Sequence, residues 1–160
     1  MELLLIVASP SGKVNVPEVG VRLVNGDHIS FLQRRSGTEF LILAARIAQH
    51  QLTDFAFSIV SFHEQVIGAH SFITRSQTPA DIVRGYTLLM EIIQGFSAAP
   101  ILPFDVGAVA IFEGLRAQRV RIATMDLRIA AIASPDLVLL TRNTSDFSKV
   151  PNLKIQGWTV

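Results

Sequence analysis

The sequence ILPFDVGAVAIFEGLRAQRVRIATMDLRIAAIASPDLVLLT, residues 101–141, decides the fold. It begins with a short apolar run at 101–104, continues with helical patterns at 106–117 and 125–133, and ends with a second apolar run at 137–141. Short strands that alternate with helices are typical of a parallel sheet whose two faces are both covered. The stretch therefore predicts an α/β fold with a mainly parallel sheet.

The same alternation extends to both sides of this stretch. We expect further strands at 21–25 and 56–60 and a weaker one at 154–158, which gives a sheet of four to five strands. Helices are expected at 28–35, 38–50, 62–76 and 79–96. The last of these has the clearest start, because Thr78 can cap it and Pro79 suits the first helical position. Residues 1–20 form either an added edge strand or a leader, and the domain is expected at 21–160.

Composition narrows the class of protein. With 160 residues, 17.5 kDa, 49% hydrophobic and 17% charged residues, the chain has the size and apolar content of one folded domain. Its mean hydropathy is +0.42, but it has no run of about 20 apolar residues, so we expect no membrane-spanning helix. The lack of cysteine excludes disulfides and thiolate metal sites and favours a cytoplasmic location. A net charge of +1 excludes a strongly basic nucleic-acid wrapper.

Four acidic residues fall close to the edge of the sheet where the strands end. Asp27 follows the first expected strand, Glu64 lies in the first turn after the second, and Asp146 lies in the loop after the fourth. Asp126 begins a helix, and residues 117–124 are long enough to bring that helix back to the same edge. Carboxylates gathered at one edge repel one another unless a cation neutralises them. Oxygen ligands without cysteine suit Mg²⁺ or Mn²⁺, which activate water and stabilise a transferring phosphoryl group.

A structural role is also open to each of these acids. Ser61 and Glu64 have the spacing of a capping box in which Ser61 caps the helix at 62–76. Asp126 can complement the helix dipole behind a cap by Thr124. Asp27 can cap the helix at 28–35, and Asp146 can form an Asx turn in its loop. Taken singly, each acid fits a structural role better than a catalytic one.

Several segments carry motifs in a fixed order. Ile122-Ala-Thr-Met-Asp-Leu-Arg-Ile-Ala-Ala131 contains T-x-D-x-x-I-A-A, and Leu139-Leu-Thr-Arg-Asn-Thr-Ser-Asp-Phe147 contains T-x-N-x-x-D-F. They are preceded by Asp27-His-Ile-Ser-Phe-Leu-Gln-Arg34 and Val60-Ser-Phe-His-Glu-Gln65. In this order the segments, over about residues 23–158, resemble the PIN-domain family. The likeness is specifically to the VapC-type toxin ribonucleases of toxin–antitoxin pairs.

The resemblance implies a three-layer α/β/α sandwich, Rossmann-like, in which acids bind Mg²⁺ or Mn²⁺ and RNA is hydrolysed. Glu64, Asp126 and Asp146 match three of the family's acidic positions. The family's first acid, in Leu-Asp-Thr-Asp or Leu-Asp-Thr-Asn, corresponds to Asn25. The amide oxygen of Asn25 can contact a cation, but it brings no negative charge and cannot act as a base. Asp27 can partly replace the lost charge along a local path that Gly26 permits.

Weaker substrate-binding candidates lie near these acids. Thr124 and Asn143 could orient ligands, and arginines of this region could hold RNA phosphates with a strong dependence on salt. The arginine candidates are Arg128, Arg142 and the group of Arg116, Arg119 and Arg121.

Two hypotheses follow for the function. The first is a metal-dependent endoribonuclease, the toxin of a type II toxin–antitoxin pair, with catalytic Glu64, Asp126, Asp146 and Asp27 and with Asn25 as an additional metal ligand. Its expected partners are RNA, an antitoxin protein and a second copy of the chain, for which the helices at 62–76 and 79–96 offer surfaces. The second is a catalytically impaired PIN fold that binds RNA or a partner protein, and Asn25 and Gly26 favour it.

Overall fold

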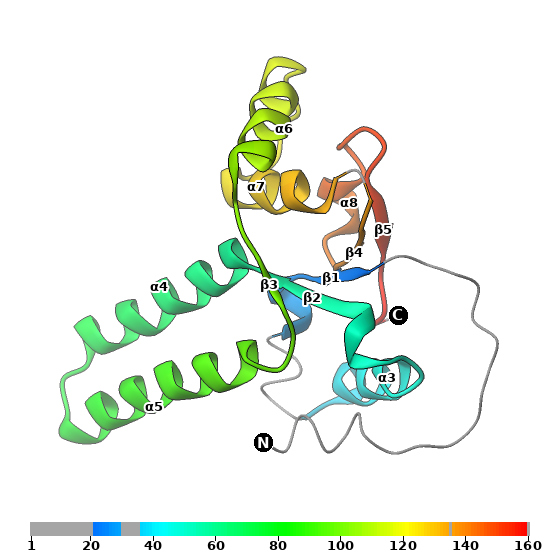
Figure 1. Ribbon diagram of the computed structural model, residues 1–160. Helices are drawn as coiled ribbons and strands as arrows, with labels where there is room; N and C mark the ends of the chain where they lie inside the picture. Colours follow the sequence, from blue (N-terminus) through cyan, green and yellow to red (C-terminus); the bar gives the residue numbers. More distant parts are fainter. Residues whose placement is uncertain (1–20, 30–35, 135, 160) are drawn as a thin grey trace.

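The computed structural model describes residues 21–29, 36–134 and 136–159 (Figure 1). The expected N-terminal extension at 1–20 lies outside the described residues, as does most of the helix expected at 28–35. Residues 26–29 are helical, so this helix begins two residues earlier than the sequence predicts.

Five parallel strands form one sheet. They are β1 (Arg22–Val24), β2 (Phe55–Ser58), β3 (Ile101–Leu102), β4 (Val138–Leu140) and β5 (Lys154–Gln156), in the order β3-β2-β1-β4-β5. The central strand β1 pairs with β2 and β4, and Arg22 lies opposite Phe55 and Val138. The pairs β2–β3 and β4–β5 are also parallel, which confirms the predicted parallel sheet. All five strands therefore end at the same edge of the sheet.

Four of the predicted helices begin within one residue of the expected position, and the helix expected at 62–76 begins three residues earlier. The helices are α3 (Thr38–Ile47), α4 (Ile59–Arg75), α5 (Pro79–Phe96), α6 (Val106–Ala117), α7 (Thr124–Ala133) and α8 (Thr144–Phe147), with a 3₁₀ turn η1 (Leu52–Asp54) before β2. The predicted bounds 79–96 and 106–117 are confirmed. Thr78 Oγ1 accepts a hydrogen bond from the Asp81 amide at 3.1 Å, which caps α5 as expected. Neither η1 nor α8 was predicted from the sequence, and the residues of α8 were expected to form a loop.

Helices cover both faces of the sheet. In the central strands Leu23, Ala56 and Leu139 point into a core shared with α6 and α7, which includes Phe112, Leu115 and Ile129. The neighbouring residues Val24, Phe57 and Leu140 point into a second core shared with α3, α4 and α5, which includes Leu43, Ala69 and Phe96. The two cores confirm the three-layer α/β/α architecture, and Figure 1 shows the two groups of helices on opposite sides of the strands.

The helices α4 and α5 form a long hairpin that extends away from the sheet (Figure 1). They approach so closely at Gly85 that a Cβ atom there would lie 2.4 Å from Ile73 Cγ1. On the outer face of α5, four apolar side chains have between 56% and 67% of their surface exposed: Val83, Tyr86, Met90 and Ile93. Among the described residues, none of the helices has the length and apolar content needed to cross a membrane.

Candidate functional site

A pocket of about 360 Å³ opens at the edge where β1, β2 and β4 end. It is lined by residues from the end of β1, from the first two turns of α4, from the first turn of α7 and from the start of α8. They are Asn25, Gly26, Asp27, Ser61, Glu64, Gln65, Asp126 and Asn143. Residues up to 118 positions apart in the sequence therefore meet at the place that the parallel strands predict.

Glu64 reaches this pocket from the second turn of α4. The predicted capping box is wrong, because α4 begins at Ile59 and its cap is Ser58, whose side chain accepts from the Ser61 amide at 2.9 Å. Ser61 lies inside the helix and is fully buried. Burial raises the pKa of Glu64, and the negative charge of Asp126 raises it further, while His63 opposes the shift. Glu64 therefore does not have the capping role that the sequence predicts for it.

Asp126 reaches the same pocket from the first turn of α7. The expected Thr124 cap is wrong, because Thr124 is the first residue of the helix and the preceding Ala123 makes no capping bond. Burial raises the pKa of Asp126, as do the charges of Asp146 and Asp27, and a hydrogen bond from Asn143 only partly offsets them. Asp126 and Glu64 therefore form a pair of carboxylates, from two different helices, whose negative charge is unfavourable without a cation.

Asn25 lies at the end of β1, where it is 6% exposed. Its backbone nitrogen donates to Leu140 O at 3.0 Å, which continues the pairing with β4. Its side-chain Nδ2 donates to Thr141 Oγ1 at 3.2 Å, and its Oδ1 accepts from the Gly26 amide at 2.8 Å. The oxygen that was expected to contact a cation is therefore engaged with the backbone of the next residue.

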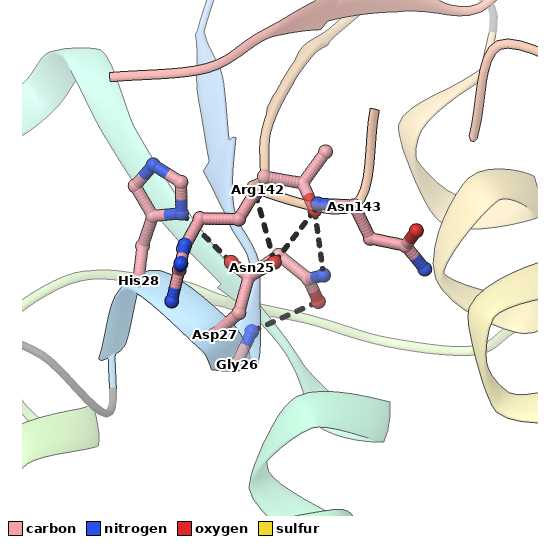
Figure 2. Close-up of polar contacts among 7 residues, drawn as sticks. Asn25, Gly26, Asp27, His28, Arg142 and Asn143 are labelled. Atoms are coloured by element: carbon pink, nitrogen blue, oxygen red, sulfur yellow. Dashed lines mark hydrogen bonds and ion pairs between the residues drawn. The ribbon is translucent and has the colours of Figure 1, made fainter. Parts of the chain in front are cut away.

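Asp27 connects the helix after β1 to the loop after β4 (Figure 2). Its Oδ2 accepts from Thr141 Oγ1 at 2.8 Å and from the Arg142 amide at 2.9 Å, and its Oδ1 lies 2.7 Å from Nδ1 of the buried His28. Burial opposes ionisation, but these bonds outweigh it and hold the pKa of Asp27 below its usual value. The predicted cap of the helix at 28–35 is wrong, because Asp27 lies inside that helix and binds the β4 loop instead. Hydrogen bonds thus occupy both oxygens that were expected to replace the missing charge.

Asp146 lies in α8, beside the pocket, and it is not among the residues that line it. Lys149 Nζ donates to its Oδ1, and Asn143 Nδ2 donates to its Oδ2 at 3.1 Å. The bonds from Lys149 and Asn143 lower the pKa of Asp146. The same Asn143 nitrogen lies 3.5 Å from Asp126 Oδ2, so Asn143 joins Asp146 to the pocket. The expected Asx turn is replaced by a short helix with its own ion pair.

Four of the weaker substrate-binding candidates differ in whether they line the pocket. Asn143 lines it, and its amide donates to Thr141 Oγ1 at 3.0 Å. The backbone amide of Arg142 donates to Asp27, which lines the pocket. Thr124 is exposed at the start of α7, and the Arg128 guanidinium lies 5.8 Å from the ring centre of Phe112. The structure therefore brings Asn143 into the pocket and leaves the other three outside its lining.

Sequence reasoning missed two residues that organise this site. Thr141 is fully buried, and its hydroxyl contacts Asn25, Asp27 and Asn143. Its place directly after β4 was a usable signal, because the first residue after a parallel strand lies at the functional edge. Lys149 was also missed, although it follows Asp146 at the three-residue spacing that brings helical side chains together.

The carboxylates fit a divalent ion only in part. Among residues 21–29, 36–134 and 136–159, no group of three or more His, Asp or Glu side chains is arranged to hold a metal ion. Asp27, Glu64 and Asp126 line one pocket and Asp146 lies beside it, but they are not arranged as a metal-binding group. Glu64 and Asp126 remain, and Mg²⁺ is commonly held by one or two carboxylates together with water and substrate phosphates. The residues present thus fit an ion that binds together with a phosphate group.

Comparison with known proteins identifies the fold. No protein-family model matches the chain, and no curated protein matches its sequence. VapBC-1 from nontypeable Haemophilus influenzae has a TM-score of 0.68 and 22% identity over 88% of this chain and 99% of that chain. VapBC2 from Rickettsia felis, bound to a DNA fragment from its promoter, has a TM-score of 0.67 and 18% identity over 86% and 98%. FitAcB from Neisseria gonorrhoeae has a TM-score of 0.64 and 23% identity over 84% and 96%.

The strand order, the three layers and the similar solved structures together show that this chain has the PIN-like α/β/α fold, as the sequence predicts. The likeness is to chains of VapBC and FitAB toxin–antitoxin complexes, and it spans nearly the whole of each neighbouring chain. At 18–23% identity it is a likeness of fold.

Proposed function

We propose that this protein is a ribonuclease of the VapC type, which hydrolyses RNA phosphodiesters with Mg²⁺ or Mn²⁺ and acts as the toxin of a toxin–antitoxin pair. The observation that carries the proposal is the pairing of Glu64 and Asp126 in one pocket at the carboxyl ends of the strands. The raised pKa of each carboxyl supports it, because an unneutralised acid pair is costly and a bound cation removes that cost. The fold shared with chains of toxin–antitoxin complexes supports the role as a toxin, and RNA is the substrate that the resemblance to VapC-type ribonucleases implies.

Glu64 and Asp126 would hold the ion. When bound, it would supply a water or hydroxide nucleophile at neutral pH and offset the charge of the phosphate. In this proposal Asn143 fixes the orientation of Asp126 through its Nδ2, and Asp146 acts on the pocket through the same amide. Lys149 pairs with Asp146, so Asp146 would contact the ion only if this ion pair opened.

Asp27 has a positioning role in this proposal. It accepts the Thr141 hydroxyl and the Arg142 amide, and Thr141 in turn accepts the Asn143 amide. This chain of bonds sets the position of the loop that carries Asn143. We assign RNA contact to Arg142, Arg128 and Thr124, none of which is among the residues that line the pocket. A fall in RNA affinity that depends on salt would follow from removing either arginine.

A second candidate function is favoured by Asn25. An amide at this position, with its oxygen engaged by Gly26, leaves the pocket with fewer negative charges than the family's pattern provides. In this alternative the chain is a catalytically impaired PIN fold that binds RNA or a partner protein. The location remains the cytoplasm, as the lack of cysteine suggests.

RNA cleavage tests the two candidates directly. The purified protein is incubated with structured RNA in Mn²⁺, in Mg²⁺ and in chelator, beside Asp126→Asn and Asn25→Asp. Asp136→Asn is the matched control, because Asp136 is exposed just after α7. Cleavage that needs metal, disappears in Asp126→Asn and persists in Asp136→Asn supports the ribonuclease. Cleavage that arises only in Asn25→Asp supports the impaired fold.

We propose two protein partners. An antitoxin-like protein is supported by the fold shared with VapBC and FitAB complexes, and co-purification with the product of a small neighbouring reading frame tests it. Failure of the two chains to associate would contradict this assignment.

The second partner is another copy of the chain, packed on the exposed face of α5. Antiparallel pairing of two α5 helices would place Val83 opposite Ile93 and Tyr86 opposite Met90, because these pairs are symmetric about the middle of the helix. Light scattering should therefore find a dimer that Tyr86→Glu dissociates. Glu91→Gln, an exposed position off this stripe, should leave the dimer intact, and a monomeric parent protein would contradict the assignment.

A further inference from the structure

The dipeptide Asn25-Gly26 stands where the pocket lacks a carboxylate. Both residues line the pocket with Glu64 and Asp126. The backbone nitrogen of Gly26 lies 2.8 Å from Asn25 Oδ1. The carbon that carries this oxygen is therefore close to a backbone nitrogen that can attack it.

Asparagine followed by glycine is the sequence most prone to spontaneous deamidation, because glycine has no side chain to hinder ring closure. The Gly26 nitrogen loses its proton and attacks Asn25 Cγ, which forms the C–N bond of a succinimide ring. The Cγ–Nδ2 bond breaks, and the side-chain nitrogen leaves as ammonia after taking up a proton. Water then opens the ring at Cγ and leaves a carboxylate there, so the net change is one water consumed and one ammonia released.

Glycine at position 26 is not explained by packing or by backbone conformation. A Cβ atom there would make its nearest contact with Glu64 Oε2 at 3.9 Å, an ordinary van der Waals distance. Among the described residues, the only glycine with positive φ is Gly37, so Gly26 has a backbone conformation open to other residues. Glycine at this position also leaves ring closure at Asn25 unhindered.

The backbone contacts of Asn25 favour aspartate over isoaspartate as the product of ring opening. The backbone nitrogen of Asn25 donates to Leu140 O, and the backbone oxygen of Asn25 accepts from the His28 and Ile29 amides at 3.1 Å. Isoaspartate would add a carbon to the backbone between these contacts and break their register, whereas an aspartate keeps them. The new carboxylate would lose only the bond that Nδ2 makes to Thr141 Oγ1.

We propose that Asn25 is a self-modifying residue, which deamidates to an aspartate and thereby adds a carboxylate to the metal pocket beside Glu64 and Asp126. The chemical step stands on its own, and its consequence for metal binding rests on the proposed function. The added carboxylate beside Glu64 and Asp126 has no cation to neutralise it until a divalent ion binds. The converted protein should therefore be less stable than the parent in chelator and should regain stability in Mn²⁺. We expect its Mn²⁺ affinity to rise at least about tenfold, because a full charge replaces a dipole at the ion.

The test follows the folded, full-length protein during incubation at mildly alkaline pH. Peptide mapping by mass spectrometry measures conversion at position 25, with Asn143 and Asn152 of the same chain as internal controls because threonine and leucine follow them. Gly26→Ala is the matched variant, since the structure has room for the methyl group and ring closure is hindered. Asn25→Asp provides the finished product for Mn²⁺ titration and thermal unfolding.

Selective conversion of Asn25 to aspartate, absent in Gly26→Ala, supports the proposal. Equal rates in the parent and in Gly26→Ala, or isoaspartate as the main product, would overturn the chemical step. If Asn25 converts but Asn25→Asp binds Mn²⁺ no more tightly than the parent, the consequence for metal binding is overturned. If Mn²⁺ binds neither the parent nor Asn25→Asp, the proposed function fails while the modification stands.

Discussion

Replacing Asp27 by alanine removes the acceptor that joins the helix after β1 to the loop after β4. Three donors lose their partner, and two of them, the Thr141 hydroxyl and His28 Nδ1, belong to side chains that are fully buried. Each buried donor left without a partner costs about 1–3 kcal/mol, whereas water can replace the bond to the exposed Arg142 amide. We therefore expect Asp27→Ala to lower the free energy of unfolding by about 3 kcal/mol, a large share of the roughly 5–15 kcal/mol typical of a domain.

Asp27→Asn is the matched control for this experiment. Its amide oxygen can still accept from Thr141 and Arg142, so the expected loss is about 1 kcal/mol, mainly from the bond to His28. Urea denaturation followed by the fluorescence of Trp158, the only tryptophan, measures both values. Because the pKa of Asp27 is lowered in the folded state, the stability it contributes is present at neutral pH and is lost as pH falls through that folded value.

Mn²⁺ affinity distinguishes a positioning role of Asp27 from a role as a metal ligand. If Asp27 positions the loop, Asp27→Asn should retain the Mn²⁺ affinity of the parent. A loss in Asp27→Ala below about 0.5 kcal/mol, within the range of ordinary surface substitutions, would refute the role of this acceptor. Loss of Mn²⁺ binding in a fully folded Asp27→Asn would instead restore the ligand role that the sequence suggested.

Three further outcomes follow from the packing and the charges. Gly85→Ala places a Cβ 2.4 Å from Ile73 Cγ1 and should cost about 1–3 kcal/mol in urea denaturation. Its control, Gly68→Ala, meets no atom within 4 Å and should gain about 0.5–1 kcal/mol, and equal effects would contradict the packing. The pKa of Glu64 is raised, so Glu64→Gln should be more stable than the parent at neutral pH, with an advantage that shrinks as pH falls through the folded value towards 4.5. A thermal-unfolding difference independent of pH would contradict this expectation. Lys149→Ala should raise Mn²⁺ affinity in calorimetric titration by releasing the Asp146 carboxylate, and unchanged or weaker binding would count against that release.

The sequence predicts the start of a helix well where a capping residue marks it. The start of α5 follows from Thr78 and Pro79, and the start of α6 follows from Asp105, whose carboxylate accepts from the Ala108 amide at 2.9 Å. The start of α4 was misplaced because two serines precede the same apolar run. Only the structure distinguishes Ser58, which caps the helix, from Ser61, which the helix buries.

The edge that gathers the acids could be predicted, but their chemical states could not. Parallel topology brings Glu64 to this edge, and the return of the chain between α6 and α7 brings Asp126 to the same pocket. The state of Asp27 depends on contacts with residues 114 and 115 positions away, which no local pattern reports. The ion pair of Asp146 with Lys149 depends on α8, a helix of four residues that is too short to leave a periodic signal.

A crystal structure of the protein soaked in Mn²⁺ tests the central assignment most directly, because the anomalous signal locates the ion. We expect one peak bonded to carboxylate oxygens of both Glu64 and Asp126, at about the 2.0–2.2 Å typical of small divalent ions and oxygen. A saturated crystal with no peak between these two side chains, or with its peak on other residues, would contradict the assignment of this pocket as the metal centre.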